Sequence, residues 1–231
     1  MNHARNLDFS PVDIMTNLVY TGIFKKGGKE IFRSQMVAGY QSVITGMRFG
    51  PDGWAIERNT RYPDHVDGNE EMLKNLLDGR ILNGWSLRKI LEDQATYDGA
   101  VGAIEQVPYV STEYAIVSGV KKGVIVAKDP ESVAHLQILN QPGGNFEERD
   151  DYVIITNFDF FFHDIREEFD PTGGGPKPRR VLAQEFLNAT AVLTPNVLFE
   201  AINYKGVIAD TIFQAIMNVE KSVWNVSQPD L

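Results

Sequence analysis

The sequence predicts an α+β protein in which stacked sheets are covered by helices. Strand-like segments and helical segments come in separate blocks along the chain rather than alternating one by one, which disfavours repeated βαβ units. The strand blocks are punctuated by Gly, Pro and Asp turns, and the helical blocks repeat their apolar residues with a period near 3.6. With 231 residues, 43% of them hydrophobic, the chain can bury one sizeable core, and we expect a single domain over residues 1–231.

The first block is expected to be strands. They are Leu18–Phe24, Glu30–Val37, Gln41–Phe49 and Trp54–Arg58. The first two should form a hairpin, because the Gly-rich segment 25–29 between them has the chemistry of a tight turn. Residues 50–53, Gly-Pro-Asp-Gly, predict a second turn.

A helical block follows. Helices are expected over Asn69–Leu82, Ser86–Gln94 and Asp98–Gln106, with Ser86 as an N-cap. Apolar residues at helical spacing predict two buried stripes, formed by Leu73, Leu76 and Leu77 and by Leu87, Ile90 and Leu91.

Strands then resume, followed by helices and strands again. The expected strands are Glu113–Ser118, Gly123–Lys128, Val133–Leu139 and Tyr152–Thr156. A Gly- and Pro-rich loop over 170–178 leads to helices at Arg179–Leu187 and from Pro195 to Asn203, the second capped by Thr194 with Pro195 at its first position. Strands at Thr211–Val219 and Ser222–Val226 close the chain.

Composition excludes several classes of function. Lys and Arg number 22 against 31 Asp and Glu, a net charge of −9, so we expect no nucleic-acid partner. A sequence pI near 5.0 suits an acidic compartment. No apolar run is long enough to cross a bilayer and no signal region opens the chain, so we expect a soluble chain. With no cysteine and four dispersed histidines, we expect neither a metal site nor a cofactor.

Two glycosylation sequons are present, at Asn188 and Asn225. Such triplets are modified only on chains that enter the secretory route, and chance also supplies them. They give modest support to a lumenal location.

The opening segment His3–Phe9 is the most informative stretch, because it places Arg5 and Asp8 three residues apart between hydrophobic residues. Taken alone, the pair could be a local ion pair at the end of a strand, and such pairs contribute little to stability. Four further stretches add weight. They are residues 36–40 with 45–47, the pair Glu57-Arg58, the segment Thr156-Asn157-Phe158-Asp159, and Pro178-Arg179-Arg180 with the helix that ends at residues 187–190.

Together, in this order and spacing, the five stretches resemble the family of acid ceramidases and N-acylethanolamine acid amidases. The resemblance covers nearly the whole chain. It implies the four-layer αββα sandwich of N-terminal-nucleophile hydrolases, whose catalytic cysteine uses its own α-amino group as the base and requires no histidine. It also implies an amide hydrolase of N-acyl lipids, with ceramide ranked before N-acylethanolamines.

The resemblance assigns roles to five catalytic residues. Arg5 would favour the thiolate and hold the substrate carbonyl, and Asp8 would orient the α-amine. Asn157 would stabilise the oxyanion, although a capping role is an equally good interpretation. Glu57 would organise the site, or be a charge at a strand end in solvent. Arg179 would contact the substrate headgroup through its planar fork of donors, or begin a solvated helix.

Aromatic residues near Asn157 are candidates for binding the acyl chain or meeting a membrane surface. These substrate-binding candidates are Phe158, Phe160 and Phe161. Packing in the core is the default for such a run, and we expect it for at least half of the run.

The family pattern places a cysteine-bearing strand before the opening motif. The sandwich implied here is therefore incomplete at its N-terminus, and we expect the sequence to be a truncated gene product, a fragment, or a relative without catalysis, the first two being favoured. The expected partners are the N-acyl lipid and the missing N-terminal strand or subunit of the same precursor, in a lysosomal or secreted setting. As given, the chain should not hydrolyse amides. The alternatives are a non-catalytic lipid-binding relative and a bile-salt- or penicillin-type amidase of the same fold.

Overall fold

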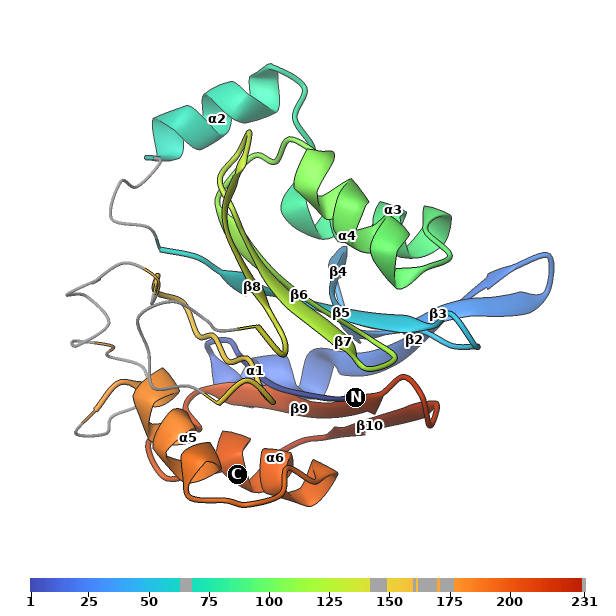
Figure 1. The fold of residues 1–231 in the computed structure, drawn as a ribbon. Coiled ribbons are helices and arrows are strands. Elements are labelled where there is room, and N and C mark those ends of the chain that lie inside the picture. Colours follow the sequence, from blue (N-terminus) through green and yellow to red (C-terminus); the bar gives the residue numbers. More distant parts are fainter. Residues whose placement is uncertain (63–67, 142–148, 160, 162–169, 171–176, 230–231) are drawn as a thin grey trace.

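The computed structural model describes residues 1–62, 68–141, 149–159, 161, 170 and 177–229. Two sheets lie face to face in the middle of the molecule, with one set of helices above them and another below (Figure 1). This arrangement confirms the expected α+β class with stacked, helix-covered sheets.

The larger sheet has seven antiparallel strands in chain order. They are β2 (Val19–Lys26), β3 (Lys29–Val37), β4 (Tyr40–Arg48), β5 (Trp54–Thr60), β6 (Glu113–Gly119), β7 (Lys122–Lys128) and β8 (Val133–Ile138). All of these strands were predicted, with ends that differ by a few residues. Every neighbour in the sheet is also the next strand in sequence, so short turns join all neighbouring pairs except β5 and β6, between which the chain forms three helices.

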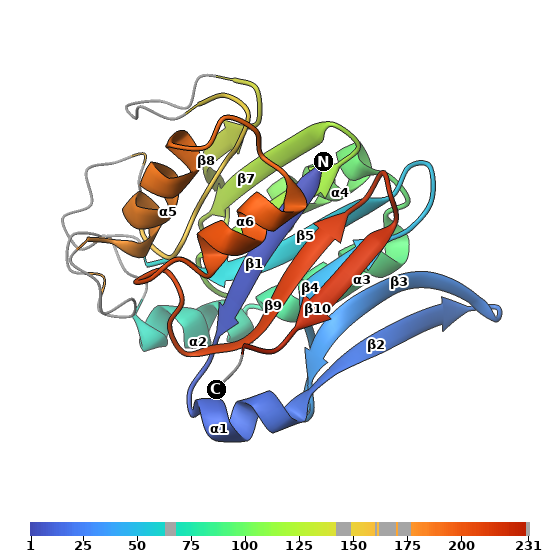
Figure 2. The ribbon, with the colours of Figure 1, turned by 90° about the horizontal axis from the view of Figure 1, so that it is seen from below.

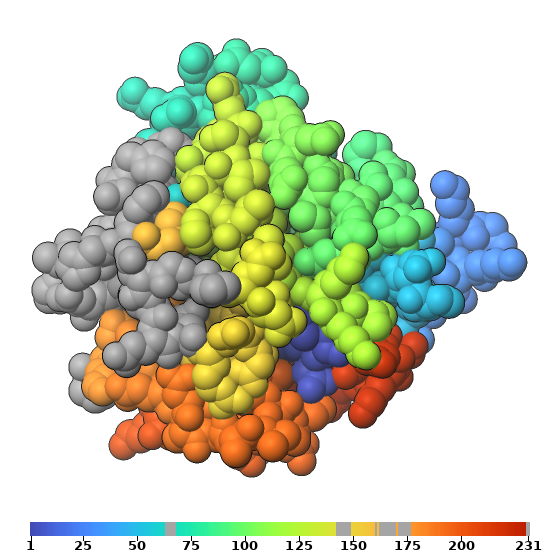
Figure 3. Space-filling model, in the orientation of Figure 1, coloured from blue at the N-terminus to red at the C-terminus, as the bar shows by residue number. Residues whose placement is uncertain are grey.

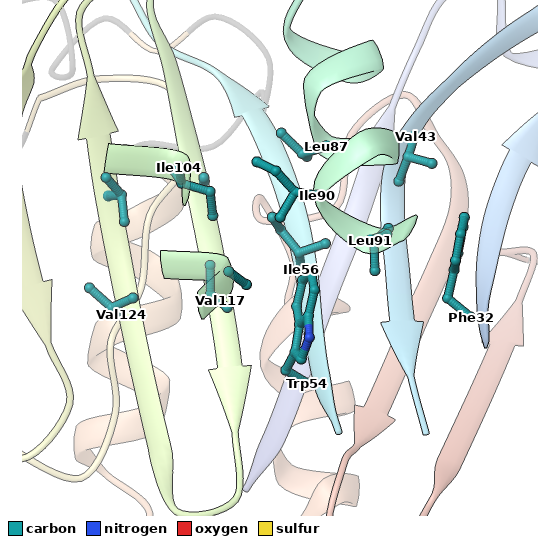
Figure 4. Packing of buried hydrophobic residues seen from close by; sticks show 13 residues of the cluster. Phe32, Val43, Trp54, Ile56, Leu87, Ile90, Leu91, Ile104, Val117 and Val124 are labelled. Carbon is teal, nitrogen blue, oxygen red and sulfur yellow. The ribbon is translucent and has the colours of Figure 1, made fainter. Parts of the chain in front are cut away.

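Three helices, α2 (Asn69–Leu77), α3 (Asn83–Asp93) and α4 (Tyr97–Gln106), follow β5, and α3 and α4 pack on the larger sheet. Leu87, Ile90 and Leu91 of α3 point onto the strands and are buried as predicted (Figure 4). Gly46 allows this close approach, since a Cβ there would lie 2.5 Å from Cδ1 of Leu91. The predicted N-cap was wrong: α3 begins at Asn83, and Ser86 is buried inside it.

The predicted buried stripe of α2 was also wrong. Leu73, Leu76 and Leu77 are 57%, 46% and 78% exposed, and the helix ends at Leu77 rather than Leu82. The side of α2 that faces the protein carries Asn75, whose Nδ2 donates to the Val110 carbonyl at 3.0 Å. This polar contact turns the leucines outward.

The smaller sheet joins the two ends of the chain. Its order is β1 (Asn2–Asp8), β9 (Thr211–Asn218) and β10 (Val223–Ser227), all antiparallel (Figure 2). The helices α5 (Arg179–Asn188) and α6 (Pro195–Ile202) lie beside this sheet, and the Thr194 hydroxyl caps α6 as predicted by accepting from the Val197 N–H at 3.2 Å. A short helix α1 (Val12–Met15) and a 3-10 turn η1 (Thr16–Leu18) link β1 to β2 and were not predicted.

The alternating orientation of side chains along β1 determines which residues face the larger sheet. Within β1, only His3, Arg5 and Leu7 are buried, and Leu7 packs with Val37, Ile44 and Phe213 between the sheets. The intervening residues point to the side where α6 lies, as the contact from Asn6 Nδ2 to the Ile202 carbonyl at 2.7 Å shows.

The predicted strand Tyr152–Thr156 is not a strand. Its side chains nevertheless alternate: Val153 and Ile155 pack on β6 and β7, whereas Ile154 packs against α5 and α6. The segment therefore fills the space between the larger sheet and the lower helices through side-chain contacts, without a backbone ladder. In the described residues, no helix has the length and apolar character needed to cross a membrane.

Candidate active site

A cleft of about 1230 Å³ runs along β1. It is bounded by β1, residues 57–60 of β5, residues 116–118 of β6, the segment 151–158, α5 and α6. The start of the chain reaches the surface between the β6–β7 turn and the smaller sheet, while segment 149–159 lies over α5 and α6 (Figure 3). All five predicted catalytic residues line this cleft, together with Phe158. The structure thus brings together residues from four separate parts of the sequence.

Arg5 links the two sheets at the floor of the cleft. Its Nη1 donates to the Thr45 hydroxyl at 2.7 Å and to the Ile44 carbonyl at 3.1 Å, and its Nη2 donates to Asn59 Oδ1 at 3.3 Å. Only 4% of Arg5 is exposed. Burial lowers the pKa of its guanidinium, and the charges of Glu57 and Asp8 oppose that effect.

Glu57 is buried beside Arg5 and is not the solvent-exposed strand-end charge of the alternative interpretation. Its Oε2 lies 3.5 Å from Arg5 Nε and 3.3 Å from His3 Nε2. His3 Nδ1 in turn lies 2.9 Å from the Ser118 hydroxyl on β6. The Glu57 carboxylate therefore lies between His3 and Arg5, two side chains from the same face of β1.

Asp8 does not pair locally with Arg5. Its Oδ2 accepts from Arg179 Nη1 at 2.8 Å and its Oδ1 accepts from the Thr211 hydroxyl at 2.5 Å. The alternation of β1, with a register shift between Leu7 and Asp8, turns Asp8 to the side opposite Arg5. The local ion pair considered from the sequence is therefore wrong.

Arg179 connects three segments at the other end of the cleft. Beyond Asp8, its Nη2 donates to Asn157 Oδ1 at 2.7 Å and its Nε donates to Asp170 Oδ2 at 2.8 Å. Only 7% of Arg179 is exposed, so it is not the start of a solvated helix. Asn157 is held further by donation from its Nδ2 to the Thr60 carbonyl at 2.8 Å.

The three aromatic candidates have different positions. Phe158 lines the cleft and its ring lies 5.7 Å from that of Tyr62. Phe161 is not among the residues that line the cleft: it packs on β6 and β7, and its ring stacks on His135 at 4.3 Å. Its assignment to substrate binding is corrected to core packing. Phe160 lies outside the described residues.

The residues that hold the catalytic candidates in place were not predicted from the sequence. They are His3, Thr45, Asn59, Asp170 and Thr211. His3 carried a signal, since it lies two residues before Arg5 and so shares its face of a strand. The others come from strands or loops far along the chain, and nothing local marks them. Among the described residues, no group of three or more His, Asp or Glu is placed to bind a metal ion.

A second buried acidic group lies behind the cleft, at the start of β6. Glu113 is fully buried, and its Oε2 lies 2.6 Å from Arg58 Nε. Burial raises the pKa of Glu113 to about 7, and the positive charge of Arg58 opposes the rise. Tyr109 also faces this group.

Because the folded-state pKa of Glu113 is raised, its contribution to stability is present in full at acidic pH and is lost as pH rises through about 7. We expect the free energy of unfolding to fall by on the order of 2–3 kcal/mol between pH 4.5 and pH 8.5 from this group. Glu113→Gln should remove that component. Urea unfolding of the wild-type and Glu113→Gln proteins at a series of pH values measures this fall in stability. The same pH dependence in both proteins would contradict the raised pKa of Glu113.

Both sequon asparagines are exposed. Asn225 lies on β10, and Asn188 ends α5, where its Oδ1 accepts from the Tyr152 hydroxyl at 2.8 Å. Their positions are compatible with the expected glycosylation.

Comparison with known structures assigns the fold. The chain superimposes on a Caenorhabditis elegans ortholog of N-acylethanolamine-hydrolyzing acid amidase with a TM-score of 0.79 and 23% identity, over 99% of this chain and 94% of that one. The architecture is thus that of the N-terminal-nucleophile hydrolases, as the resemblance implied.

Curated sequences give the family. The chain is 30% identical to N-acylethanolamine-hydrolyzing acid amidase of Caenorhabditis elegans over 68% of this chain, and 27% identical to the Mus musculus enzyme over 94%. It is 21% identical to Homo sapiens acid ceramidase over 95%. The chain belongs to this family of acid ceramidases and N-acylethanolamine acid amidases, whose members are amide hydrolases. It spans about half the length of these relatives, from 42% to 56%. No family model matches the chain.

Proposed function

We propose that the chain forms most of the catalytic part of an amide hydrolase that acts on N-acyl lipids. The observation that carries the proposal is the cleft along β1, which combines apolar walls with the polar side chains of Arg5, Asp8, Asn157 and Arg179. Its apolar lining includes Ala183, Leu187, Leu193, Leu198, Ala201 and Val207. A cavity of this size suits an acyl chain, with the amide at the polar groups.

The nucleophile is proposed to come from a segment preceding β1. β1 pairs with β9 on one side, and among the described residues no strand pairs with its other edge. Residues 1–9 also line the cleft. An extended segment pairing with that edge would satisfy its backbone groups and bring a cysteine to the cleft. That segment would be the partner missing from this chain.

The proposed reaction divides the work among the five residues. The cysteine thiolate attacks the amide carbonyl, the α-ammonium gives its proton to the departing amine, and water then hydrolyses the thioester. Arg5 favours the thiolate and Asp8 orients the α-amine. Asn157 donates to the oxyanion. Arg179 holds the substrate headgroup, and Glu57 keeps Arg5 in place.

Two classes of substrate are candidates. The resemblance ranks ceramide first, whereas the relatives with higher identity hydrolyse N-acylethanolamines. We propose an N-acylethanolamine as the first substrate to test and ceramide as the second. A conjugated bile salt represents the more polar amidases of the same fold.

The test compares this chain with the longest chain that its gene encodes. We expect the longer chain to release fatty acid from N-palmitoylethanolamine or ceramide at acidic pH, and this chain to release none. Release from none of the three substrates by a folded longer chain would reject the proposed enzyme. A gene without an upstream cysteine would instead favour the alternative, a lipid-binding relative without catalysis.

A lysosomal or secreted location with contact to a membrane surface is also proposed. The exposed leucines of α2 could enter the lipid interface, and the exposed Asn188 and Asn225 could carry glycans. Flotation with lipid vesicles tests the first point, and a mobility shift with an endoglycosidase tests the second. Absence of both effects in the native protein would reject this placement.

A further inference from the structure

A second cavity, of about 440 Å³, lies on the other side of Arg58 and Tyr40 from the main cleft. Arg58, Tyr40 and Gly39 line both cavities. The hydrogen bond from Arg58 Nη1 to the Tyr40 hydroxyl, at 3.1 Å, joins two residues of this shared border. We call this second space the α2–α3 pocket, because its remaining walls come largely from α2, α3 and the loop between them.

The pocket combines one cation, a group of uncharged polar side chains and a group of apolar side chains; the polar group includes Gln41, Ser42, Asn83 and Ser111. Met72, Leu82, Trp85 and Val110 form the apolar part of the wall. Among the described residues that line it, Arg58 is the charged one. Ligand sites in proteins typically combine such an apolar lining with a few fixed polar groups.

Arg58 is held rigidly enough to orient a ligand. Its Nε lies 2.6 Å from Glu113 and its Nη1 donates to Tyr40, while 20% of the side chain is exposed. These contacts use Nε and Nη1 and leave Nη2 for another acceptor. When Glu113 is protonated, the charge of Arg58 is no longer neutralised within the protein.

We propose that the α2–α3 pocket binds a fatty acid, with its carboxylate at Arg58 and its alkyl chain along Met72, Leu82 and Trp85. A carboxylate can accept a charge-assisted hydrogen bond from Arg58 Nη2, which its contacts to Glu113 and Tyr40 do not use. The apolar part of the wall favours an anion that carries an alkyl chain, and the single cation disfavours a highly charged one. This inference does not depend on the proposed hydrolase activity, since binding is measured on the chain as it stands.

Trp85 reports occupancy directly. An ω-bromo fatty acid of medium chain length, below its micelle concentration, should quench Trp85 fluorescence saturably. Trp54 is fully buried under the helices and Trp224 lies on β10, away from the pocket. Trp85→Phe should therefore remove the saturable component. The ω-bromo alcohol of equal length should bind at least about tenfold more weakly, a difference of about 1.4 kcal/mol.

Two exposed leucines give a matched pair of variants. Leu82→Glu places a negative charge in the pocket wall and should weaken the binding of the acid about tenfold or more. Leu77→Glu makes the same change on α2 at a residue that lines neither cavity and should leave binding unchanged. Arg58→Lys keeps a cation beside Glu113 but removes the Nη2 donor, and should also weaken binding.

Calorimetry distinguishes the two cavities. Calorimetry could detect binding of the acid that neither quenches Trp85 nor responds to Leu82→Glu. In that case the acid would bind in the main cleft, and the proposal would be overturned. Equal affinity for the acid and the alcohol would overturn the role of Arg58. Absence of any binding would reject the site.

Discussion

Replacing Arg61 by Met is expected to lower the free energy of unfolding by about 3–5 kcal/mol, because it leaves the buried carboxylate of Asp159 without its cationic partner. Arg61 is fully buried, and its guanidinium contacts both oxygens of Asp159, at 2.6 and 2.7 Å, and Asp129 Oδ1 at 2.6 Å. The Tyr114 hydroxyl also donates to Asp159. Urea denaturation monitored by circular dichroism measures the loss.

A surface pair provides the control for Arg61. Lys89 Nζ lies 2.9 Å from Asp93 on α3, with both side chains well exposed. Lys89→Met should therefore leave the unfolding midpoint nearly unchanged. A similar small effect for Arg61→Met would show that the buried network does not stabilise the fold as described.

The Arg61 network matters for the candidate site because of where Asp159 lies. Asp159 is two residues beyond Asn157, and the network ties this segment to β5, β6 and the end of β7. Since Tyr152–Thr156 has no strand pairing, these side-chain contacts and the bond from Asn157 Nδ2 to the Thr60 carbonyl fix its position. Loss of Arg61 should therefore also loosen Asn157.

The second large effect concerns Asn157. In the longest chain that the gene encodes, Asn157→Asp is expected to lower kcat by roughly 10²–10³, because the oxyanion loses an N–H donor. The substitution keeps an oxygen for Arg179 Nη2 but removes the donor to the Thr60 carbonyl, so some loss of stability is expected beside the loss of catalysis. Steady-state kinetics, together with the thermal midpoint, separate catalysis from stability.

Lys177→Met is the matched control for Asn157. Lys177 is an exposed cation two residues before Arg179 and pairs with Glu185 on the surface. Its loss should change kcat little. An Asn157→Asp protein that is stable and retains full activity would contradict the donor role and leave Asn157 as a positioning residue for Arg179.

Local pattern predicted most of the fold, because most of its elements are defined by nearby residues. Each strand of the larger sheet pairs with the next strand in sequence, so alternation and turn chemistry indicated every pairing except that of β5 with β6, which lie on either side of three helices. The wrong predictions concern segments whose conformation depends on contacts with residues far along the chain. The buried Asn75 turned the leucines of α2 outward, and side-chain packing on two sides held Tyr152–Thr156 without a strand partner.

The candidate site was predicted through the family resemblance rather than from local chemistry. Alternation could have shown that Arg5 and Asp8 face opposite sides of β1, yet nothing local joins Asp8 to Arg179, 171 residues away. The same holds for Arg61, whose partners lie 68 and 98 residues further along the chain. Such ion pairs depend on how segments cross in space, and sequence spacing alone carries no signal for them.

Trapping of an acyl-enzyme tests the central claim, that the cleft along β1 is an amide hydrolase site. The longest chain that the gene encodes is mixed with N-palmitoylethanolamine or ceramide at acidic pH, quenched with acid and analysed by intact mass spectrometry. We expect one acyl group per protein, attached to a cysteine upstream of β1, and less of it in the Asn157→Asp protein. A correctly folded protein that hydrolyses these lipids without acylation at that cysteine, or that is not acylated and hydrolyses neither lipid, would contradict the account.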